Sequence, residues 1–334
     1  MSKLVTIFGG SGFVGRYVAS RMAQDGWRVR VACRRPETAG FVRTYGDVGQ
    51  VEPVMCNIRN DDSVRSVMRG ADAVVNCVGT FDRKGKNNFG AVQDEGATRI
   101  ARIATEEGAT HLVHISAIGA DVDVDGASLY SQSKGRGEVG VQEHFPNAVI
   151  LRPSVVFGPE DQFFNRFAGM TKFGPVLPVV GADTRFQPVF VGDVAKAVAT
   201  AAQSTATRGI YELGGPDVNT FRELMQAMLE IIRRRRLIMN IPFLPAQLLG
   251  VLMEAGQTLT LGLVSAQITR DQVKSLKSDN IVQDGARGLR DLGVEPTAMA
   301  AVLPDYLWRF RPSGQYAAIK ESAKDAAGKL GPQQ

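Results

Sequence analysis

The stretch Leu4-Val-Thr-Ile-Phe-Gly-Gly-Ser-Gly-Phe-Val-Gly15 decides the fold of this chain. It begins as a short apolar run and then carries glycines at positions 9, 12 and 15, three residues apart, before a helical pattern that reaches Gln24. A strand that turns through glycines three residues apart into a helix is typical of the first unit of a doubly wound α/β sheet.

The same alternation continues through the first 160 residues. Short apolar runs predict strands, and the segments between them have helical patterns. Such chains make right-handed crossovers, so we expect a parallel sheet covered by helices on both faces. The predicted strands are 4–8, 28–33, 51–58, 73–78, 111–116 and 148–156, and the predicted helices are 13–24, 61–68, 92–107 and 130–144.

Three parts are expected along the chain. Residues 1–160 would form a Rossmann dinucleotide-binding domain, residues 161–311 a smaller α/β lobe interleaved with it, and residues 312–334 an extended tail. In the second part we predict strands at 187–191 and 209–213, a helix at 193–202, and another helix opened by a capping box at Thr220–Glu223. This lobe should pack over the carboxyl edge of the first sheet, where ligands bind in such folds.

The composition excludes several classes of protein. Hydrophobic residues make up 44% and charged residues 22% of the 334 residues, as in ordinary globular chains. The three cysteines lie in apolar runs, which indicates a reducing compartment, and the three histidines lack metal-ligand spacing. A net charge of +5 without a nucleic-acid-binding motif argues against nucleic acid as a partner, and no apolar run is long enough to span a membrane.

The glycine loop has the features of a pyrophosphate site. Gly9 would allow the tight turn, Gly12 would let the backbone approach the phosphates, and Gly15 would let the helix pack on the strand. The free N–H groups of the helix N-terminus, at Phe13 and Val14, would face the phosphates. A purely structural glycine loop is the alternative reading.

Two arginines follow the second predicted strand. An enzyme that uses NAD normally places an acidic residue there for the ribose hydroxyls, but this chain reads Ala32-Cys-Arg-Arg-Pro36. The guanidinium groups of Arg34 and Arg35 would pair with a 2′-phosphate, which predicts NADPH as the cofactor. The alternative is that both arginines are simply solvated.

Ser116, Tyr130 and Lys134 could carry acid–base chemistry. Ser116 ends the fifth predicted strand, and Tyr130 and Lys134 are four residues apart on one face of the following helix. The ammonium would lower the pKa of the phenol and contact the nicotinamide ribose, and the serine would hold a carbonyl or hydroxyl group. A tyrosine–lysine pair at this spacing also occurs by chance.

Together these motifs resemble the extended short-chain dehydrogenase/reductase family over about residues 3–216. Further matching segments are Asn76-Cys-Val-Gly79, Arg152-Pro-Ser154 and Val191-Gly-Asp-Val-Ala195. The resemblance implies that Asn57 and Ile58 flank the adenine, Val78 and Gly79 the adenosine side, and residues from Pro153 to Val156 the nicotinamide. Asn57 stands where the family usually has Asp, and the segment between Ser116 and Tyr130 is shorter than in sugar-nucleotide epimerases.

Two segments give a narrower resemblance. Leu151–Ala168 and Trp308–Gln315 are similar to the NADPH-binding accessory subunits of respiratory complex I, NADH:ubiquinone oxidoreductase, in mitochondria and alpha-proteobacteria. In that family the nucleotide is a structural element of the peripheral arm, close to the membrane and off the electron path. This implies other complex I subunits as partners, no turnover at Ser116, Tyr130 and Lys134, and a place on the cytoplasmic face of a bacterial inner membrane or on the mitochondrial matrix side.

An apolar segment follows a cluster of four arginines, Arg233–Arg236. Residues 237–269 contain a single charged residue, Glu254. We predict a short apolar helix there that meets the membrane interface or a partner, with the arginines on lipid head groups or acidic residues. The alternative is that residues 237–269 fill the core of their own lobe.

Three functions are therefore open from the sequence. The first is a non-catalytic, NADPH-binding accessory subunit of complex I. The second is a free NADPH-dependent reductase or dehydrogenase for a small carbonyl or hydroxyl compound, with Tyr130 as proton donor, Lys134 as its activator and Ser116 as orienting group. The third is a redox-sensing regulator that binds NADP(H) without turnover.

Overall fold

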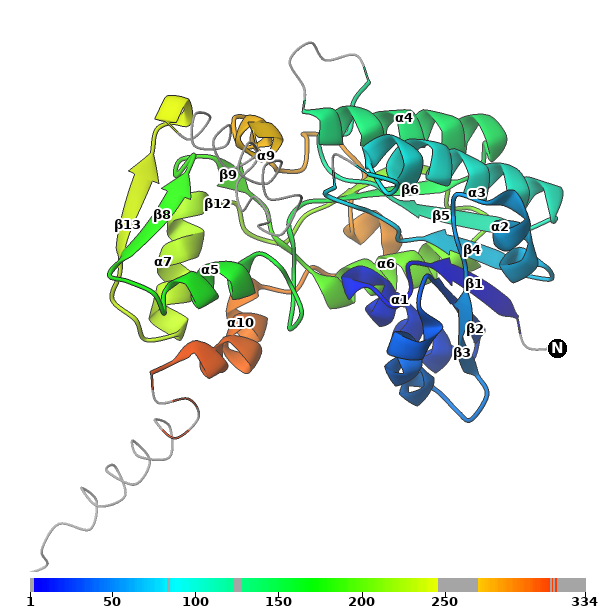
Figure 1. Cartoon of the computed structure of the whole chain (residues 1–334), viewed down its shortest axis with the longest axis horizontal. Coiled ribbons are helices and arrows are strands. Elements are labelled where there is room, and N and C mark those ends of the chain that lie inside the picture. The colour runs from blue at the N-terminus through cyan, green and yellow to red at the C-terminus, as the bar shows by residue number, and fades with distance from the viewer. Residues whose placement is uncertain are drawn as a thin grey trace, which may run out of the picture.

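A parallel seven-stranded sheet forms the centre of the larger part of the molecule (Figure 1). The structure is a computed structural model and describes residues 3–82, 85–122, 128–245 and 270–312, together with 314 and 316. The strand order is β11-β6-β5-β4-β1-β2-β3, and every neighbouring pair is parallel. The strands are β1 (Leu4–Phe8), β2 (Arg28–Cys33), β3 (Val51–Met55), β4 (Ala73–Asn76), β5 (His111–Ile115), β6 (Val149–Pro153) and β11 (Gly209–Leu213).

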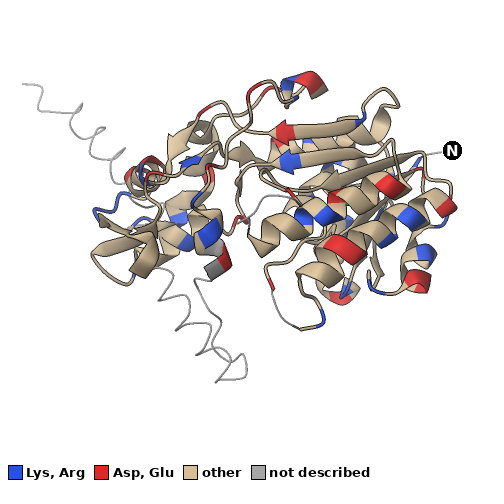
Figure 2. Cartoon of the chain, turned by 90° about the horizontal axis from the view of Figure 1, so that it is seen from above, with Lys and Arg blue, Asp and Glu red and all other residues tan. Residues whose placement is uncertain are grey.

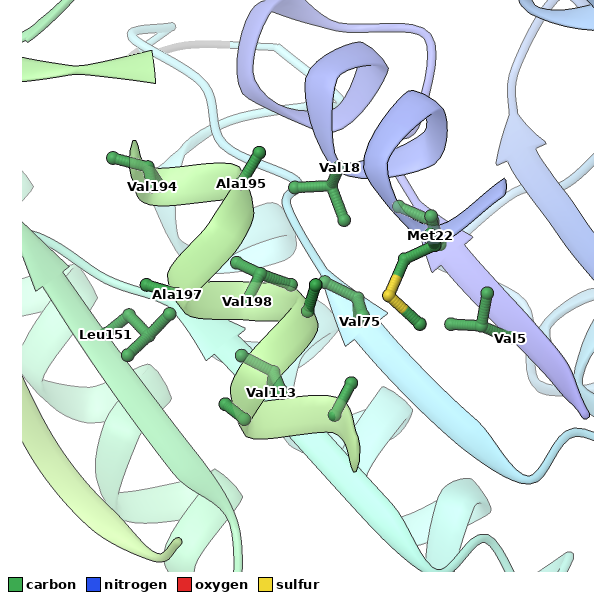
Figure 3. Packing of buried hydrophobic residues seen from close by; sticks show 14 of the residues in the cluster. Val5, Val18, Met22, Val75, Val113, Leu151, Val194, Ala195, Ala197 and Val198 are labelled. Atoms are coloured by element: carbon green, nitrogen blue, oxygen red, sulfur yellow. The ribbon is translucent and has the colours of Figure 1, made fainter. Parts of the chain in front are cut away.

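Helices cover both faces of this sheet (Figure 1). One face packs against α1 (Phe13–Gln24) and α6 (Val191–Gln203), and the other against α2 (Asp61–Met68), α3 (Glu95–Glu106) and α4 (Leu129–His144). On the first face Ala195 and Val198 of α6 lie over the sheet beside Val18 and Met22 of α1 (Figure 3). Because both faces are covered, the strands are apolar almost throughout.

A smaller lobe has its own aromatic core. Its helices and sheets enclose Phe163, Phe164, Phe167, Phe186 and Phe221, whose rings pack at centroid distances of 5.0 to 6.0 Å. The elements of this half are β7 (Val156–Phe157), α5 (Phe164–Met170), β8 (Val176–Val180), β9 (Arg185–Phe186), β10 (Val189–Phe190), β12 (Asn219–Thr220), α7 (Phe221–Ile231), β13 (Leu237–Ile241), α9 (Arg270–Ser275) and α10 (Met299–Leu307).

Most predicted elements of the first 160 residues are confirmed. Strands β1 and β2 and helices α1 and α2 have the predicted bounds. The predicted strand 51–58 ends earlier, at Met55, and the predicted strand 148–156 is divided into β6 and β7. The start of the predicted helix 92–107 is a π-helical turn over Gly90–Asp94, and a 3₁₀ helix over Pro36–Tyr45 was not predicted.

One predicted element of the second half is wrong in its extent. The predicted strand 187–191 is limited to β10, because Val191 already begins α6. Within residues 237–269, where a short apolar helix was predicted, Leu237–Ile241 form β13, which pairs in parallel with β8, and residues 243–245 are helical. Strand β11 and the capping box of Thr220 with Glu223 are as predicted. Residues 246–269 and most of the predicted tail lie outside the described residues.

Charged side chains of both signs alternate along the helices that cover the large sheet (Figure 2). Several of them form ion pairs between neighbouring helices, such as Arg65 of α2 with Glu107, 2.9 Å apart, and Arg136 of α4 with Asp94, 2.9 Å apart. In the described part of the chain, no helix is long and apolar enough to cross a membrane.

Candidate functional site

The candidate site begins at the turn between β1 and α1. Gly9 has a φ of +74°, a conformation that side chains of L-residues rarely adopt. A Cβ atom on Gly15 would lie 2.3 Å from the carbonyl oxygen of Gly9, so only glycine allows the helix to start this close to the strand. This turn lies between β2 and β4, where the strand order reverses and where ligands of doubly wound sheets bind.

The N-terminus of α1 is open to a phosphate group. Gly12 is its N-cap residue, and among the described residues no side chain caps the helix. The N–H groups of Phe13 and Val14 therefore remain as donors at the positive end of the helix dipole. Val78 lies against the loop, because its Cγ2 atom would be 3.2 Å from a Cβ on Gly9. The turn thus has the shape and donors that a pyrophosphate needs.

Arg34 and Arg35 follow β2 directly and are exposed. Within the described residues neither guanidinium group takes part in an ion pair or a side-chain hydrogen bond, so both are available to a phosphate. Arg16 of α1 also lies near the loop, with its guanidinium group 4.8 Å from the ring centre of Phe41 and 3.4 Å from the carbonyl oxygen of Ser11, and it pairs with Glu160 at 3.6 Å. Among the described residues, the unpaired positive charge near the glycine loop therefore comes from Arg34 and Arg35.

The loops after β3 and β4 form the next part of the edge. Asn57 and Ile58 follow β3, and the carbonyl oxygen of the Asn57 side chain accepts a hydrogen bond from the N–H of Arg59. Asn76 ends β4 and accepts a hydrogen bond from the N–H of Val78, which fixes the residue beside Gly9. Gly79 follows, and a Cβ on it would lie 3.9 Å from the Nζ atom of Lys134.

A buried polar pair supports this loop. The Nδ1 atom of His114 on β5 lies 3.1 Å from the side-chain nitrogen of Asn76. Burial and the nearby charge of Lys134 lower the pKa of His114 to about 3, so this imidazole is neutral at physiological pH. A neutral histidine can accept the hydrogen bond from Asn76, and this role is structural.

Ser116, Tyr130 and Lys134 lie near one another along the edge but are not linked. The hydroxyl group of Ser116 is buried and has no hydrogen-bond partner among the described residues. The Nζ atom of Lys134 donates to the carbonyl oxygen of Ile115, 3.0 Å away. Within the described part of the chain no hydrogen bond joins the three side chains to one another. The unpartnered serine hydroxyl is a free polar group that a bound nucleotide could satisfy.

Tyr130 is enclosed by aromatic rings. The ring of Phe81 stacks on it with centroids 5.3 Å apart, and the edge of Phe89 packs against it at 6.0 Å. Burial raises the pKa of Tyr130 to about 12. The sequence predicted that Lys134 would lower this pKa, and that prediction is wrong for this structure, because burial dominates and the ammonium of Lys134 is held by Ile115.

The far end of the edge is formed where β6 gives way to β7. Pro153 ends β6 and Val156 begins β7, so the predicted nicotinamide contacts lie at the expected edge. Arg152 beside them forms a bidentate pair with Glu138 of α4, at 2.9 and 2.6 Å. This pair ties β6 to the helix that carries Tyr130 and Lys134.

Several residues of the site could not be found from the sequence. Gln93 is buried and bridges the loop after β4 to α4, since it donates to the carbonyl oxygen of Thr80 at 2.7 Å and accepts from the hydroxyl group of Ser133 at 2.6 Å. Phe81 and Phe89 also carry no motif that marks them. Their place at the site depends on contacts with α4, roughly forty to fifty residues further along the chain.

The arginine cluster lies far from the glycine loop and lines a groove of about 970 Å³ in the smaller lobe. Arg234 donates to the carbonyl oxygen of Phe310 and Arg236 to that of Thr171, both at 2.9 Å, so these two arginines also hold the lobe together. Arg233 and Arg235 are exposed. The groove residues are Arg222, Gln226, Leu229, Glu230, Arg233, Arg234, Arg235, Arg236, Leu237 and Ile238.

Comparison with known proteins agrees with this geometry. The family described as "NAD dependent epimerase/dehydratase family" matches residues 5–214. UDP-glucose 4-epimerase of Thermus thermophilus in complex with NAD has the same fold, with a TM-score of 0.66 and 20% identity over 93% of this chain and 99% of that chain. The predicted doubly wound fold is therefore confirmed, and both fold and family bind NAD(P).

Proteins of similar sequence confirm the resemblance to accessory subunits of complex I. NADH dehydrogenase (ubiquinone) 1 alpha subcomplex subunit 9, mitochondrial, of Arabidopsis thaliana is 32% identical, over 93% of this chain and 79% of the relative. The protein of the same name from Mus musculus is 30% identical, over 92% and 80%. Ceramide reductase of Caulobacter vibrioides is 29% identical, over 77% and 79%.

The buried ammonium of Lys134 should make stability depend on pH. Burial lowers its pKa from 10.5 to about 8, so the unfolded chain holds this proton more tightly than the folded chain does. The contribution of Lys134 to the free energy of unfolding should therefore rise between about pH 8 and pH 10.5, by about 3 kcal/mol. Buried cysteines such as Cys77, whose pKa burial raises, act in the opposite direction in every variant, so the measurement is a difference between variants. In urea unfolding across this range, the free energy of the wild type should rise relative to that of Lys134→Met, and the exposed control Lys274→Met should follow the wild type. Equal pH dependence in the wild type and Lys134→Met would contradict this prediction.

Proposed function

This chain belongs to the NAD dependent epimerase/dehydratase family and, within it, to the family of the complex I alpha subcomplex subunit 9, and from this membership we propose a function for it. The chain holds NADPH without turning it over, as an accessory subunit of respiratory complex I. It stabilises the peripheral arm of that complex near the membrane and the quinone site. Its partners are other complex I subunits, and it lies on the cytoplasmic face of a bacterial inner membrane or on the equivalent matrix side.

The observation that carries this proposal is a contrast between the two halves of the site. The phosphate half is complete, with the glycine loop, the open N-terminus of α1 and two available arginines. In the other half, Tyr130 is stacked under Phe81 and has a raised pKa, and it makes no hydrogen bond with Ser116 or Lys134 among the described residues. A phenol in this state is a poor proton donor or acceptor near neutral pH.

Each group of residues has a binding role in this proposal. Gly9, Gly12 and Gly15, with the N–H groups of Phe13 and Val14, hold the pyrophosphate. Lys134 and the free hydroxyl group of Ser116 are placed to contact the nicotinamide ribose, and Tyr130 forms a wall of the site. The adenine lies by Asn57 and Ile58, the adenosine by Val78 and Gly79, and the nicotinamide by Pro153 and Val156.

NADPH is favoured over NADH by the end of β2. Arg34 and Arg35 stand where an acidic residue would hold the ribose hydroxyls, and two guanidinium groups suit a 2′-phosphate. When bound, NADPH brings a nicotinamide able to transfer hydride, but this function uses only its binding energy. Ligand at about a hundred times its Kd adds about 2.7 kcal/mol to the stability of the folded chain.

The smaller lobe is the membrane-facing part in this proposal. Beside the arginine groove, the described residues expose large apolar side chains, with exposed fractions of 91% for Phe173 and 69% for Leu237. An apolar surface flanked by arginines suits the boundary between acyl chains and anionic head groups. Arg233 and Arg235, which are exposed, would contact lipid phosphates.

Arg34→Asp should weaken binding of NADPH about tenfold to a hundredfold, because a charge-assisted pair with the 2′-phosphate is lost and a repulsion is added. Binding of NADH, which lacks this phosphate, should change much less. Fluorescence titration of both nucleotides measures the effect. The matched control is Arg43→Asp, at an exposed position of the neighbouring 3₁₀ helix, and it should leave the preference unchanged. If Arg34→Asp leaves the preference for NADPH intact, the assignment of the cofactor is wrong.

Purification from membranes tests the function itself. The tagged chain, solubilised in mild detergent, should co-purify with NADH:quinone reductase activity. Its NADPH should stay bound and remain reduced while NADH feeds quinone. A soluble protein without partners would instead support the free NADPH-dependent reductase; the Caulobacter relative is named a reductase. Oxidation of the bound NADPH during turnover would contradict a purely structural role.

Replacement of Arg233 and Arg235 by Ser should release the isolated chain from vesicles with anionic lipid at moderate salt, since each basic residue near such a surface contributes about 1 kcal/mol. Arg234 and Arg236 are left in place because they hold Phe310 and Thr171. The control replaces two exposed arginines of the sheet half, Arg43 and Arg59, by Ser. Equal release by both double variants would show that only net charge matters, and unchanged attachment would contradict the lipid contact.

A further inference from the structure

A single segment from the C-terminal part crosses the nicotinamide end of the site. We call residues 270–283 the strap. It begins with α9, which lies beside the N-terminal end of α4 (Figure 1). From there the strap passes the loop between β6 and β7 and reaches β11. It therefore contacts the two segments that flank the expected position of the nicotinamide. We call these segments the two walls of the site: the first is the first turn of α4, and the second is the loop between β6 and β7.

Asp271 fixes the first wall. Its carboxylate accepts hydrogen bonds from the N–H groups of Leu129 and Tyr130, at 2.6 and 3.1 Å, although it lies about 140 residues further along the chain. These are two of the free donors at the N-terminus of α4, where a negative charge is stabilised by the helix dipole. Asp271 is only 7% exposed, so water competes little for these bonds. The first turn of α4, which carries Tyr130 and leads to Lys134, is thus held by the strap.

Asn280 fixes the second wall. Its side-chain oxygen accepts hydrogen bonds from the hydroxyl group of Ser154 at 2.7 Å and from the N–H of Val155 at 3.1 Å. Ser154 and Val155 lie between Pro153 and Val156, the residues expected at the nicotinamide. A buried loop held by two such bonds has little freedom to move away from a bound ring.

The strap is also fastened to the smaller lobe. The hydroxyl group of Thr184 donates to the carbonyl oxygen of Leu276 at 2.5 Å, and Asp279 pairs with Arg185 at 2.7 Å. At its far end, the N–H of Gln283 donates to the carboxylate of Glu212 on β11 at 2.9 Å. The two walls of the site and the smaller lobe are therefore joined through one segment.

We propose that the strap positions the nicotinamide half of the nucleotide site, with Asp271 and Asn280 as its two positioning residues. This inference rests on the proposed function, since it assumes that a nicotinamide nucleotide occupies the edge of the sheet. Neither residue touches the nucleotide; each acts through the backbone that it holds. Because the strap is bonded to the smaller lobe, nucleotide binding and the arrangement of that lobe are coupled, and this coupling is reciprocal.

The test compares two ligands that differ in the half they occupy. NADPH fills the whole site, whereas adenosine 2′,5′-bisphosphate fills only the adenosine half. The variants Asp271→Asn and Asn280→Ala each remove a hydrogen bond at one wall. Ser154→Ala removes the hydrogen bond between Ser154 and Asn280 by changing the serine, and it is the smallest change of the three. The matched control is Asp279→Asn, which loosens the strap only at its exposed pair with Arg185.

Asp271→Asn and Asn280→Ala should weaken NADPH binding about fivefold to tenfold in calorimetric titrations, the effect of losing one or two hydrogen bonds. Binding of adenosine 2′,5′-bisphosphate should stay within twofold of the wild type, and Asp279→Asn should change neither ligand. Equal weakening of both ligands would mean that the variants merely loosen the fold, and unchanged NADPH binding would mean that the strap positions nothing; either result overturns the inference. Failure of the wild type to bind NADPH would instead overturn the proposed function.

Discussion

The close contact between the first turn of α1 and the carbonyl oxygen of Gly9 is the constraint on which the rest of the site depends. A Cβ at position 15 would stand 2.3 Å from that oxygen, so only glycine lets the helix start there, and this brings the N–H groups of α1 to the point where the strand order reverses. Most other candidate residues follow the carboxyl ends of neighbouring parallel strands and are carried to the same edge by the register of the sheet. Tyr130 and Lys134 lie instead on α4, whose first turn is held by Asp271.

Desolvation sets the protonation states of the titratable groups near the nicotinamide end of the site. The same burial that keeps Tyr130 protonated lowers the pKa of Lys134 to about 8 and makes His114 neutral. These groups have the identities of an acid–base set, but in the described part of the chain Lys134 donates to the carbonyl oxygen of Ile115, Tyr130 stacks with Phe81, and no hydrogen bond joins the two side chains. In the proposed function, the site keeps these residues and serves only to hold a nucleotide.

In the proposed function, the smaller lobe links the nucleotide site to the other subunits of complex I. Its aromatic core is separate from the two layers that cover the sheet, yet the strap joins it to the nicotinamide end. Its outer side offers an arginine groove next to exposed apolar residues. In the proposed function, a nucleotide that stabilises the edge of the sheet would therefore also stabilise the surface proposed to meet other subunits or lipid.

The sequence by itself determined the sheet, its covering helices, the phosphate loop and the arginines after β2. These features are encoded by periodicity and by glycine spacing within a few residues, which can be read locally. Only the tertiary structure decided that Phe81 covers Tyr130, that Leu237–Ile241 pairs with β8 as a strand, and that Asp271 and Asn280 hold α4 and the β6–β7 loop. These contacts join residues from some fifty to more than a hundred positions apart, and no local pattern records which partner a side chain will meet once the chain is folded.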